Sequence, residues 1–452
     1  MTSEIPSGIP SVDRCGVDWR GRRVLVVGLG KSGLAASTFL AGIGCRVRVT
    51  DRSDDEAARQ RAHQLRDLGL EAIELGGHTA RVAEGCDAVV VSPGVPESAV
   101  PLAWAMTHGV PIMSEIEVAF RFCQAPIIAV TGTNGKSSVV TLIQRVLASA
   151  RRSAIACGNV GIPFTQVLPL VTSDTSVVLE VSSFQLMWCE TFHPTIGVLL
   201  NLGVNHLDRH RDRRSYIEAK ARLFAKQTPH DAAVLNGRDR EVVAVGSRLV
   251  SRRIWFGENR DNPTAFTLDR ATCRLFPETW QAVLQVTRLA GIPDPLAVQA
   301  MKEFRGLEHR MEHLGSIRGI QIINDSKSTT PDSLLYALQR CRDGIVPILG
   351  GRDKGMDFDV LKDALVQKRI RGLVLLGEAR HRLRALFNGT PPIRECQTLD
   401  EAVRAAMAFA HPGDTVLFSP ACASFDMFRN FEERGIAFKH LVDQCRAQQV
   451  GG

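Results

Sequence analysis

The chain of 452 residues is too long for one hydrophobic core and predicts about three domains at roughly 100–200 residues each. Its 44% hydrophobic and 23% charged residues are typical of a globular protein, its apolar runs are too short to span a membrane, and its first residues lack a signal-peptide pattern. The net charge of +7 favours anionic ligands such as nucleotides, whereas dispersed arginines and only two tyrosines offer no stacking platform for nucleic acid.

The eleven cysteines are scattered singly, without a Cys-x-x-Cys pair. Neither a disulfide framework nor a zinc knuckle is indicated by this spacing. A reducing compartment suits such a chain, and we expect the protein in the cytoplasm.

The first 125 residues follow the pattern of a dinucleotide-binding fold. An apolar run at 22–27 leads into the turn Gly28-Leu-Gly30-Lys-Ser-Gly33, and a second strand pattern at 45–50 ends at Asp51. In such folds glycines form the turn, a helix N-terminus binds phosphate and an acidic residue holds the ribose. The glycine motif alone is also compatible with a mononucleotide or with no ligand.

A third strand pattern at 88–91 ends in Ser92-Pro93-Gly94. The carboxyl ends of parallel strands lie at one edge of a sheet, where ligands collect. A short strand, a helix and a connector are expected at 111–125, so the first domain should close near Ala125.

The next stretch, 126–140, reads PIIAVTGTNGKSSVV and predicts a phosphate-binding loop. A buried strand is followed by a glycine-rich turn, by Lys136 and Ser137, and by helical apolar spacing. In this arrangement backbone N–H groups face anionic oxygens, the lysine reaches the β- and γ-phosphates, and the hydroxyl holds Mg²⁺. Val130 stands where the standard pattern has glycine, and an ordinary strand–turn–helix connection is the alternative. The flanking strand and helix favour a nucleoside triphosphate.

Two further strand patterns of the central region end at Glu180 and Asn201, and His206 follows shortly after. Glu180 and His206 are therefore expected at the sheet edge that carries the phosphate loop. An oxygen ligand and an imidazole there suit Mg²⁺ held mainly by substrate phosphates, although a helix-capping glutamate and a loop histidine are the alternatives. His206 and His210 stand four residues apart, but no third zinc ligand accompanies them.

The last third of the chain predicts an open, doubly wound sheet. Strand patterns at 320–323, 346–349, 373–376 and 416–418 each end in small or polar residues. Strands that alternate with helices place this region, like the two before it, in the α/β class.

Motifs along the whole chain closely resemble those of the Mur ligase family: GTNGKSS, EVSSFQL, NLGVNHLDRH, HRMEHLG, NDSKSTT, GGRDKGMDF and SPACASFDMFRNFEERG. The resemblance runs from about residue 22 to about residue 435. It implies a Rossmann-like UDP-binding domain over 1–125, a central P-loop ATPase domain with a mostly parallel sheet over 126–310, and a Rossmann-like glutamate-binding domain over 311–452.

Within the family, the motifs are most similar to members that add D-glutamate to UDP-N-acetylmuramoyl-L-alanine. The resemblance implies an ATP-dependent amide-bond ligase of peptidoglycan precursor synthesis. Such enzymes transfer the γ-phosphoryl group to the carboxylate, because carboxylate oxygen is a poor leaving group, and the glutamate amine then displaces phosphate from the acyl phosphate. The implied partners are these three small molecules and Mg²⁺, without nucleic acid or membrane, and we expect a monomer.

The resemblance also implies roles for individual residues. ATP would contact the central loop and three residues nearer the C-terminus: Gly132, Thr133, Asn134, Gly135, Lys136, Ser137, Ser138, His309, Arg310 and Asp325. Catalysis would rest on Lys136, Glu180, His206 and Lys220. Two Mg²⁺ ions would be held by Ser137, Glu180, His206 and Lys220. Lys220 matches a lysine that family members carry as a carbamate, and a solvated helix lysine is the alternative.

Two substrate pockets follow from the same resemblance. The UDP group would be held by Lys31, Ser32, Asp51, Ser92, Pro93, Gly94 and Asn159. The glutamate would be held by Lys327, Thr329, Lys354, Ser424 and Phe425. Lysines and hydroxyls are what a dicarboxylate needs, because burial of an unpaired charge is costly.

The chain departs from the family at the adenine end of the nucleotide site. Family members carry a Gly-x-His-Asn-x-x-Asn helix start, whereas the corresponding stretch here reads RLFPETWQAVLQ. Phe425 also stands where leucine is common. The missing signature leaves a nucleotide-binding regulator that has lost catalysis as an alternative. A sibling ligase of the folylpolyglutamate synthase type, which shares the ATPase and C-terminal units, is another, while an NAD-dependent dehydrogenase would explain only the first glycine motif.

Overall fold

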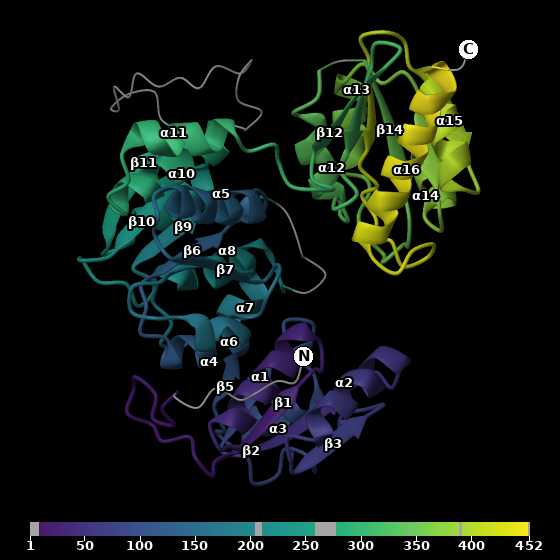
Figure 1. The fold of residues 1–452 in the computed structure, drawn as a ribbon. Helices are drawn as coiled ribbons and strands as arrows, with labels where there is room; N and C mark the ends of the chain where they lie inside the picture. Colours follow the sequence, from purple (N-terminus) through teal and green to yellow (C-terminus); the bar gives the residue numbers. More distant parts are fainter. Residues whose placement is uncertain (1–8, 204–209, 258–276, 343, 388–390, 451–452) are drawn as a thin grey trace. The chain divides into compact units, whose positions relative to one another are not determined.

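The computed structural model describes residues 9–203, 210–257, 277–342, 344–387 and 391–450. These residues form two compact units, of which the first contains 9–202, 210–257 and 277–304 and the second continues from Arg305. The first unit contains two sheets and the second unit one, and helices pack against each sheet (Figure 1). Among the described helices, none is both long and apolar enough to cross a membrane.

The first sheet has the strand order β3-β2-β1-β4-β5 and is parallel throughout. Its strands are β1 (Arg23–Val27), β2 (Arg46–Asp51), β3 (Ala72–Leu75), β4 (Ala88–Val91) and β5 (Ile112–Ser114). Its helices are α1 (Lys31–Gly42), α2 (Glu56–Arg66), α3 (Val100–Thr107) and α4 (Glu115–Phe122). The chain leaves β1 toward β2 and later returns to its other side with β4, and this reversal opens a crevice at the carboxyl ends of β1 and β4.

The second sheet has the order β11-β10-β9-β6-β8-β7 and is also parallel. Its strands are β6 (Ile127–Thr131), β7 (Ala154–Gly158), β8 (Ser176–Glu180), β9 (Ile196–Leu199), β10 (Ala232–Asn236) and β11 (Arg252–Phe256). Its helical elements are α5 (Lys136–Ser149), α6 (Phe164–Val167), η1 (Leu168–Leu170), α7 (Ser183–Met187), α8 (Arg213–Ala221), η2 (Arg222–Phe224), α9 (Arg240–Gly246), α10 (Pro277–Leu289) and α11 (Asp294–Lys302). All five residues of β6 are buried because strands flank it on both sides and helices cover it.

Two buried carboxylates of α4, those of Glu117 and Glu115, connect this helix to segments that flank the second sheet. Glu117 is fully buried and accepts hydrogen bonds from the backbone N–H groups of Glu190, Thr191 and Phe192 at 3.0–3.1 Å. Its side chain also pairs with Arg121 at 3.0 Å. These contacts join segments more than 70 residues apart in the sequence, so they hold the two sheets of the first unit together.

Glu115 makes a similar connection to the start of α6. Its Oε1 accepts a hydrogen bond from the Thr165 hydroxyl at 2.7 Å, while its buried Oε2 has no hydrogen-bond partner within the described residues. Burial raises the pKa of Glu115 to about 7, and the hydrogen bonds from Thr165 oppose that shift.

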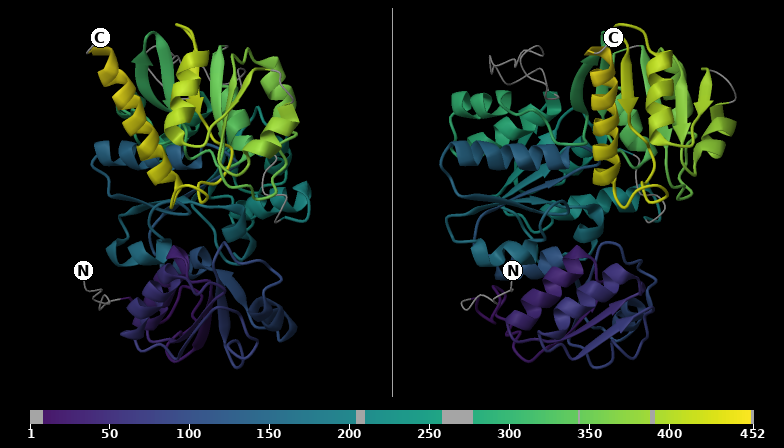
Figure 2. Two further views of the ribbon diagram at one scale, coloured as in Figure 1. Left: turned by 90° about the vertical axis from the view of Figure 1, so that its right-hand side faces the viewer. Right: turned by 45° about the vertical axis from the view of Figure 1, so that its right-hand side comes forward.

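The sheet of the second unit has the order β12-β13-β17-β14-β15-β16. Its strands are β12 (Glu312–Ile317), β13 (Ile320–Asn324), β14 (Ile345–Gly350), β15 (Leu373–Leu376), β16 (Ile393–Glu395) and β17 (Thr415–Phe418). Its helices are α12 (Pro331–Leu338), α13 (Leu361–Gln367), α14 (Arg380–Phe387), α15 (Leu399–Phe409) and α16 (Phe431–Val450). Figure 2 shows this unit from two further sides.

Alternating strand residues build a hydrophobic core on each face of this sheet. On β15, Leu373 and Leu375 pack with residues of α12 to α14, whereas Val374 and Leu376 pack with residues of α15 and α16. Such alternation is the period of a strand that is buried on both sides. The expected doubly wound arrangement is therefore confirmed.

The edge strand β12 is an antiparallel addition to the expected sheet. It pairs with β13 through a tight turn at Arg318 and Gly319, which both have positive φ angles, of 51° and 76°. Two central residues with positive φ give the turn that matches the twist of a β-hairpin. The α/β class with mostly parallel sheets is confirmed, while the domain boundaries at 125/126 and 310/311 remain predictions.

The buried Glu117 carboxylate gives a prediction about stability. In Glu117→Ala, three backbone N–H groups lose their acceptor, and the Arg121 guanidinium keeps only the carboxylate of Asp13 at 3.7 Å. We expect the first unit to lose about 3 kcal/mol or more of unfolding free energy. Urea denaturation followed by tryptophan fluorescence measures the loss, with the exposed Glu84→Ala as the matched control. Equal denaturation midpoints for the two variants would contradict this role of Glu117.

Candidate active site

The loop between β6 and α5 has the geometry of an anion cradle. Gly132 has a φ of +151°, and a Cβ there would lie 3.0 Å from the Leu200 Cβ. Gly135, with a φ of +90°, is the N-terminal cap of α5. Both positions therefore favour glycine, and the loop ends at a helix N-terminus whose partial positive charge attracts anions.

Asn201, which follows β9, holds the loop in this shape. Its side-chain Oδ1 accepts a hydrogen bond from the Asn134 N–H at 2.8 Å, and its Nδ2 donates to the Asn134 carbonyl at 3.1 Å. The backbone carbonyl of Asn201 accepts from the Thr133 N–H at 2.9 Å. The Thr133 hydroxyl is in turn 2.9 Å from the Tyr216 hydroxyl on α8.

Two lysine ammonium groups converge on this loop. Lys136 Nζ donates to the carbonyls of Gly132 and Thr133 at 2.9 and 3.0 Å, and the buried Lys220 Nζ donates to Gly132 at 3.0 Å. Burial holds the pKa of Lys220 well below its ordinary value, the charge of Lys136 lowers it further, and Glu180 opposes both effects. The fold thus brings Lys136 and Lys220, two of the residues predicted to be catalytic, to the same loop.

Glu180 ends β8, beside β6. It is 2% exposed, its Oε1 accepts a hydrogen bond from Asn159 Nδ2 at 3.0 Å, and its buried Oε2 has no hydrogen-bond partner within the described residues. A buried carboxylate oxygen without a partner is costly unless a cation or a further donor binds it.

The side chains at this edge offer the type of ligand atom that Mg²⁺ prefers. Glu180 and the buried Ser137 hydroxyl at the start of α5 are the hard oxygen ligands that Mg²⁺ takes beside phosphates. Within the described ranges, no cluster of three or more His, Cys, Asp or Glu residues could hold a metal alone. His206, the expected further ligand, lies outside the described residues.

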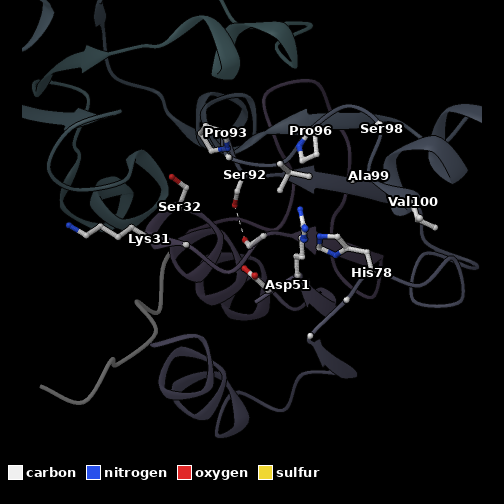
Figure 3. Close-up of a pocket in the computed structure, with 17 residues that line it drawn as sticks. Lys31, Ser32, Asp51, His78, Ser92, Pro93, Pro96, Ser98, Ala99 and Val100 are labelled. Atoms are coloured by element: carbon white, nitrogen blue, oxygen red, sulfur yellow. Dashed lines mark hydrogen bonds between the residues drawn. The ribbon is translucent and has the colours of Figure 1, made fainter. Parts of the chain in front are cut away.

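A cavity of about 760 Å³ opens at the carboxyl edge of the first sheet (Figure 3). Six of the residues expected to hold UDP line it: Lys31, Ser32, Asp51, Ser92, Pro93 and Gly94. The seventh, Asn159, is hydrogen-bonded to Glu180 and is not among the residues that line this cavity. Arg52 and His78 also line the cavity, and the sequence motifs did not reveal them.

Close backbone packing shapes the floor of this cavity. A Cβ on Gly33 would lie 1.9 Å from the carbonyl oxygen of Gly28, so α1 can approach β1 only with glycine at this position. The Ser92 hydroxyl donates to the same Gly28 carbonyl at 2.7 Å. Asp51 accepts hydrogen bonds from the backbone N–H groups of Leu29 and of Ser53, which fix its carboxylate at the cavity edge.

The residues expected to meet ATP from the second unit lie near the start of its sheet. Asp325 is buried and accepts from the Met311 N–H at 3.0 Å and from the Ser419 hydroxyl at 2.8 Å, and burial raises its pKa to about 6. His309 is also buried, has a φ of +61°, and lies 3.0 Å from Asn324 Nδ2. Arg310 stands between His309 and Met311, half-buried.

The fold brings the five residues expected to bind glutamate to one sheet edge. They follow the adjacent strands β13, β17 and β14: Lys327, Thr329, Ser424, Phe425 and Lys354. Ser424 is buried, whereas the Phe425 ring is 57% exposed and lies 5.2 Å from Lys354 Nζ. This arrangement supplies cations and hydroxyls at a single edge.

Arg434 on α16 is a further residue at this edge that the sequence did not single out. It is 2% exposed and donates to the Ser326 hydroxyl and carbonyl at 3.1 and 2.7 Å and to the Cys422 carbonyl at 3.0 Å. Burial lowers its pKa to about 10. Its guanidinium joins the loops after β13 and β17, and only its place in the motif SPACASFDMFRNFEERG could have drawn attention to it.

Three family models match the chain in order. They are "Mur ligase MurD-like, N-terminal domain" over residues 22–114, "Mur ligase middle domain" over 130–282, and "Mur ligase, glutamate ligase domain" over 309–422. Each match overlaps one of the three sheets.

Curated relatives and solved structures agree with these matches. The UDP-N-acetylmuramoylalanine–D-glutamate ligase of Desulfosudis oleivorans is 38% identical over 95% of this chain and 98% of its own length. The ligase of the same name from Koribacter versatilis is 36% identical over 96% of this chain and 100% of its own. The crystal structure of MurF ligase from Thermotoga maritima in complex with ADP shares the fold, with a TM-score of 0.57 at 14% identity, over 88% of this chain and 95% of that one. On these matches, the chain belongs to the Mur ligase family.

Proposed function

We propose that the protein is an ATP-dependent ligase that joins D-glutamate to UDP-N-acetylmuramoyl-L-alanine in peptidoglycan precursor synthesis. The observation that carries the proposal is the glycine loop on which Lys136 and Lys220 converge beside Glu180, in a chain whose full-length relatives bear this activity in their names. A reaction that consumes ATP and a nucleotide sugar belongs in the cytoplasm, and we propose that location and a monomeric protein.

The proposed reaction has two steps, a phosphoryl transfer and an acyl transfer. A carboxylate oxygen of the alanine attacks the γ-phosphorus of ATP, the bond to the β-phosphate oxygen breaks, and ADP leaves. The ammonium group of glutamate first gives a proton to solvent, and the free amine then attacks the acyl carbon. Phosphate leaves with the bonding electrons, and the second proton of the nitrogen goes to the released phosphate or to solvent. Lys136 has the role of neutralising the transferred group, and the N–H groups of the glycine loop orient the phosphates.

The acidic side of the site would hold the metal. Ser137 and Glu180 would bind one Mg²⁺, and His206 with a carbamylated Lys220 would bind a second. When bound, these ions neutralise charge on the phosphates and on the carboxylate that approaches them. Lys220 suits carbamylation because a buried amine with a lowered pKa is uncharged more often and can attack CO₂.

The two substrates other than ATP are assigned to the outer sheets. The cavity of the first sheet would take the UDP group through Lys31, Ser32, Asp51 and the segment 92–94, with Asn159 contacting the substrate beyond it. The edge formed by β13, β17 and β14 would take the glutamate. The match over 22–114 disfavours the folylpolyglutamate synthase type, which lacks this first domain, and the full set of predicted catalytic residues other than the adenine signature disfavours a regulator without catalysis.

The proposal predicts a strict dependence on two co-substrates. Release of ADP from ATP should require both UDP-N-acetylmuramoyl-L-alanine and D-glutamate, and L-glutamate should not replace the D-enantiomer. A coupled assay for ADP with each component omitted in turn measures this. If neither enantiomer raised ADP release above background, the ligase would be ruled out and a regulator favoured.

The phosphate role of Lys136 gives a second prediction. In Lys136→Ala, kcat should fall by about 10²–10³-fold, because one preorganised donor to the transferred group is lost. The exposed Lys226→Ala, in the same sheet region, is the matched control and should keep wild-type activity. A Lys136→Ala protein as active as this control would refute the assigned site.

The carbamate on Lys220 gives a third prediction. Removal of CO₂ from buffer and protein should lower activity, and added bicarbonate should restore it. After incubation with ¹³C-bicarbonate, a carbamate carbon signal should appear in the wild type and in Lys302→Ala but not in Lys220→Ala. A wild-type spectrum without that signal, at full activity, would show that Lys220 acts as an unmodified amine.

A further inference from the structure

His78 is a residue of the UDP cavity to which neither the motifs nor the proposed reaction assigns a role. It follows β3 and lines the cavity, as Asp51 and Arg52 also do. Figure 3 shows His78 near Asp51. Its Nδ1 lies 3.0 Å from the hydroxyl of Thr50, which is fully buried on β2. Its Nε2 has no hydrogen-bond partner among the residues that the structure describes.

The surroundings of Thr50 decide which ring nitrogen carries the proton. The Thr50 hydroxyl lies 3.0 Å from the Gly77 carbonyl and 3.4 Å from Glu74 Oε2, and both of these groups can only accept. The single hydroxyl hydrogen is therefore used by an obligate acceptor, and the hydroxyl turns a lone pair toward His78. This network assigns the proton to Nδ1 of His78 and leaves Nε2 as a bare acceptor.

The charge state of the ring agrees with this assignment. Burial lowers the pKa of His78 below its ordinary value. The carboxylates of Asp51 and Glu74 oppose that shift, whereas the guanidinium of Arg52 adds to it. His78 is thus a neutral imidazole at pH 7, and a neutral imidazole has one donor and one acceptor nitrogen.

An acceptor at this place is selective for one part of the substrate. A lone pair repels the oxygens of the diphosphate, which suit Lys31 and Arg52 instead. The nucleoside offers neutral donors, namely the N3–H of uracil and the ribose hydroxyls. We infer that Nε2 of His78 accepts a hydrogen bond from the nucleoside of the UDP-linked substrate and makes His78 a specificity-determining residue; this inference rests on the proposed function.

The test measures binding of UDP and of analogues that each lack one donor. Calorimetry is carried out at pH 7 with UDP, 3-methyl-UDP, 2′-deoxy-UDP and 3′-deoxy-UDP. The proteins are the wild type, His78→Ala, which leaves room for the methyl group, and His63→Ala, an exposed histidine on α2 of the same sheet region. Thr50→Val is added because it keeps the side-chain volume but removes the hydroxyl that holds the Nδ1 proton.

For the wild type and for His63→Ala, we expect one analogue to bind about tenfold more weakly than UDP. For His78→Ala, we expect the same analogue to bind as tightly as UDP. The methyl analogue would identify the base as the donor, and a deoxy analogue the ribose. Thr50→Val should reduce the discrimination. Equal discrimination in the wild type and in His78→Ala would overturn the inference, and so would a wild type that does not bind UDP.

Nitrogen NMR of the unliganded protein is a second, independent readout. The ¹⁵N resonances of His78 should show a protonated Nδ1 and an unprotonated Nε2 at pH 7, and Thr50→Val should weaken that preference. A protonated Nε2 would overturn the inference even if a variant failed to fold. Neither measurement needs turnover, so the two proposals can fail separately. A protein that shows the expected binding and NMR results but no ligase activity would refute the proposed function alone. An active ligase that lacks those results would refute only the role of His78.

Discussion

The carbonyl oxygen of Gly132 accepts hydrogen bonds from two lysine ammonium groups, and much of the central site depends on this convergence. Burial and the charge of Lys136 lower the pKa of Lys220, whereas Glu180 raises it, so these three side chains together set the charge of the site. Asn201 fixes the loop that carries the carbonyl through hydrogen bonds made by both the backbone and the side chain of Asn201. In the proposed function, this loop shape would therefore be in place before the phosphates bind.

The parallel sheets explain how one chain can present three kinds of binding edge. In each sheet the carboxyl ends of adjacent strands bring together residues that are distant in sequence. The first sheet gives a cavity with cations and an acceptor, the second a glycine cradle with an acidic neighbour, and the last a cluster of lysines and hydroxyls. Glu115 and Glu117 fix the first two of these edges relative to each other through buried hydrogen bonds.

Much of this arrangement could be predicted from the sequence, because central strands such as β1, β6 and β15 are apolar runs that end in glycine or polar residues. Strands at or near the edges gave no such signal: β3 is only partly buried, and Arg252 and Arg253 of β11 are exposed. The antiparallel β12 was missed for the same reason, since its residues are largely exposed.

The site was predictable where a motif lies within one turn and less so where side chains meet across the fold. The phosphate loop and the segment 92–94 are local, and the structure brings them to the expected edges. The hydrogen bond from Asn159, predicted near the UDP group, to Glu180 joins residues at the ends of different strands of the central sheet and has no local sequence signal. His78 lies in the turn after β3 and Arg52 in the turn after β2, and neither turn has a periodic pattern that marks a cavity residue. Arg434 was not predictable because its contact with Ser326 spans 108 residues.

The buried Arg434 has a thermodynamic consequence for the second unit. Its guanidinium forms hydrogen bonds to carbonyl and hydroxyl oxygens but no salt bridge among the described residues. The charges of Asp426 and Asp325 oppose the effect of burial on its pKa only in part, so folding has removed a cation from water with incomplete compensation. In the proposed function, the glutamate carboxylates at the adjacent edge would recover part of that cost. Folding and ligand binding would then be linked, and glutamate would raise the melting temperature of the second unit by mass action as well as by electrostatic compensation.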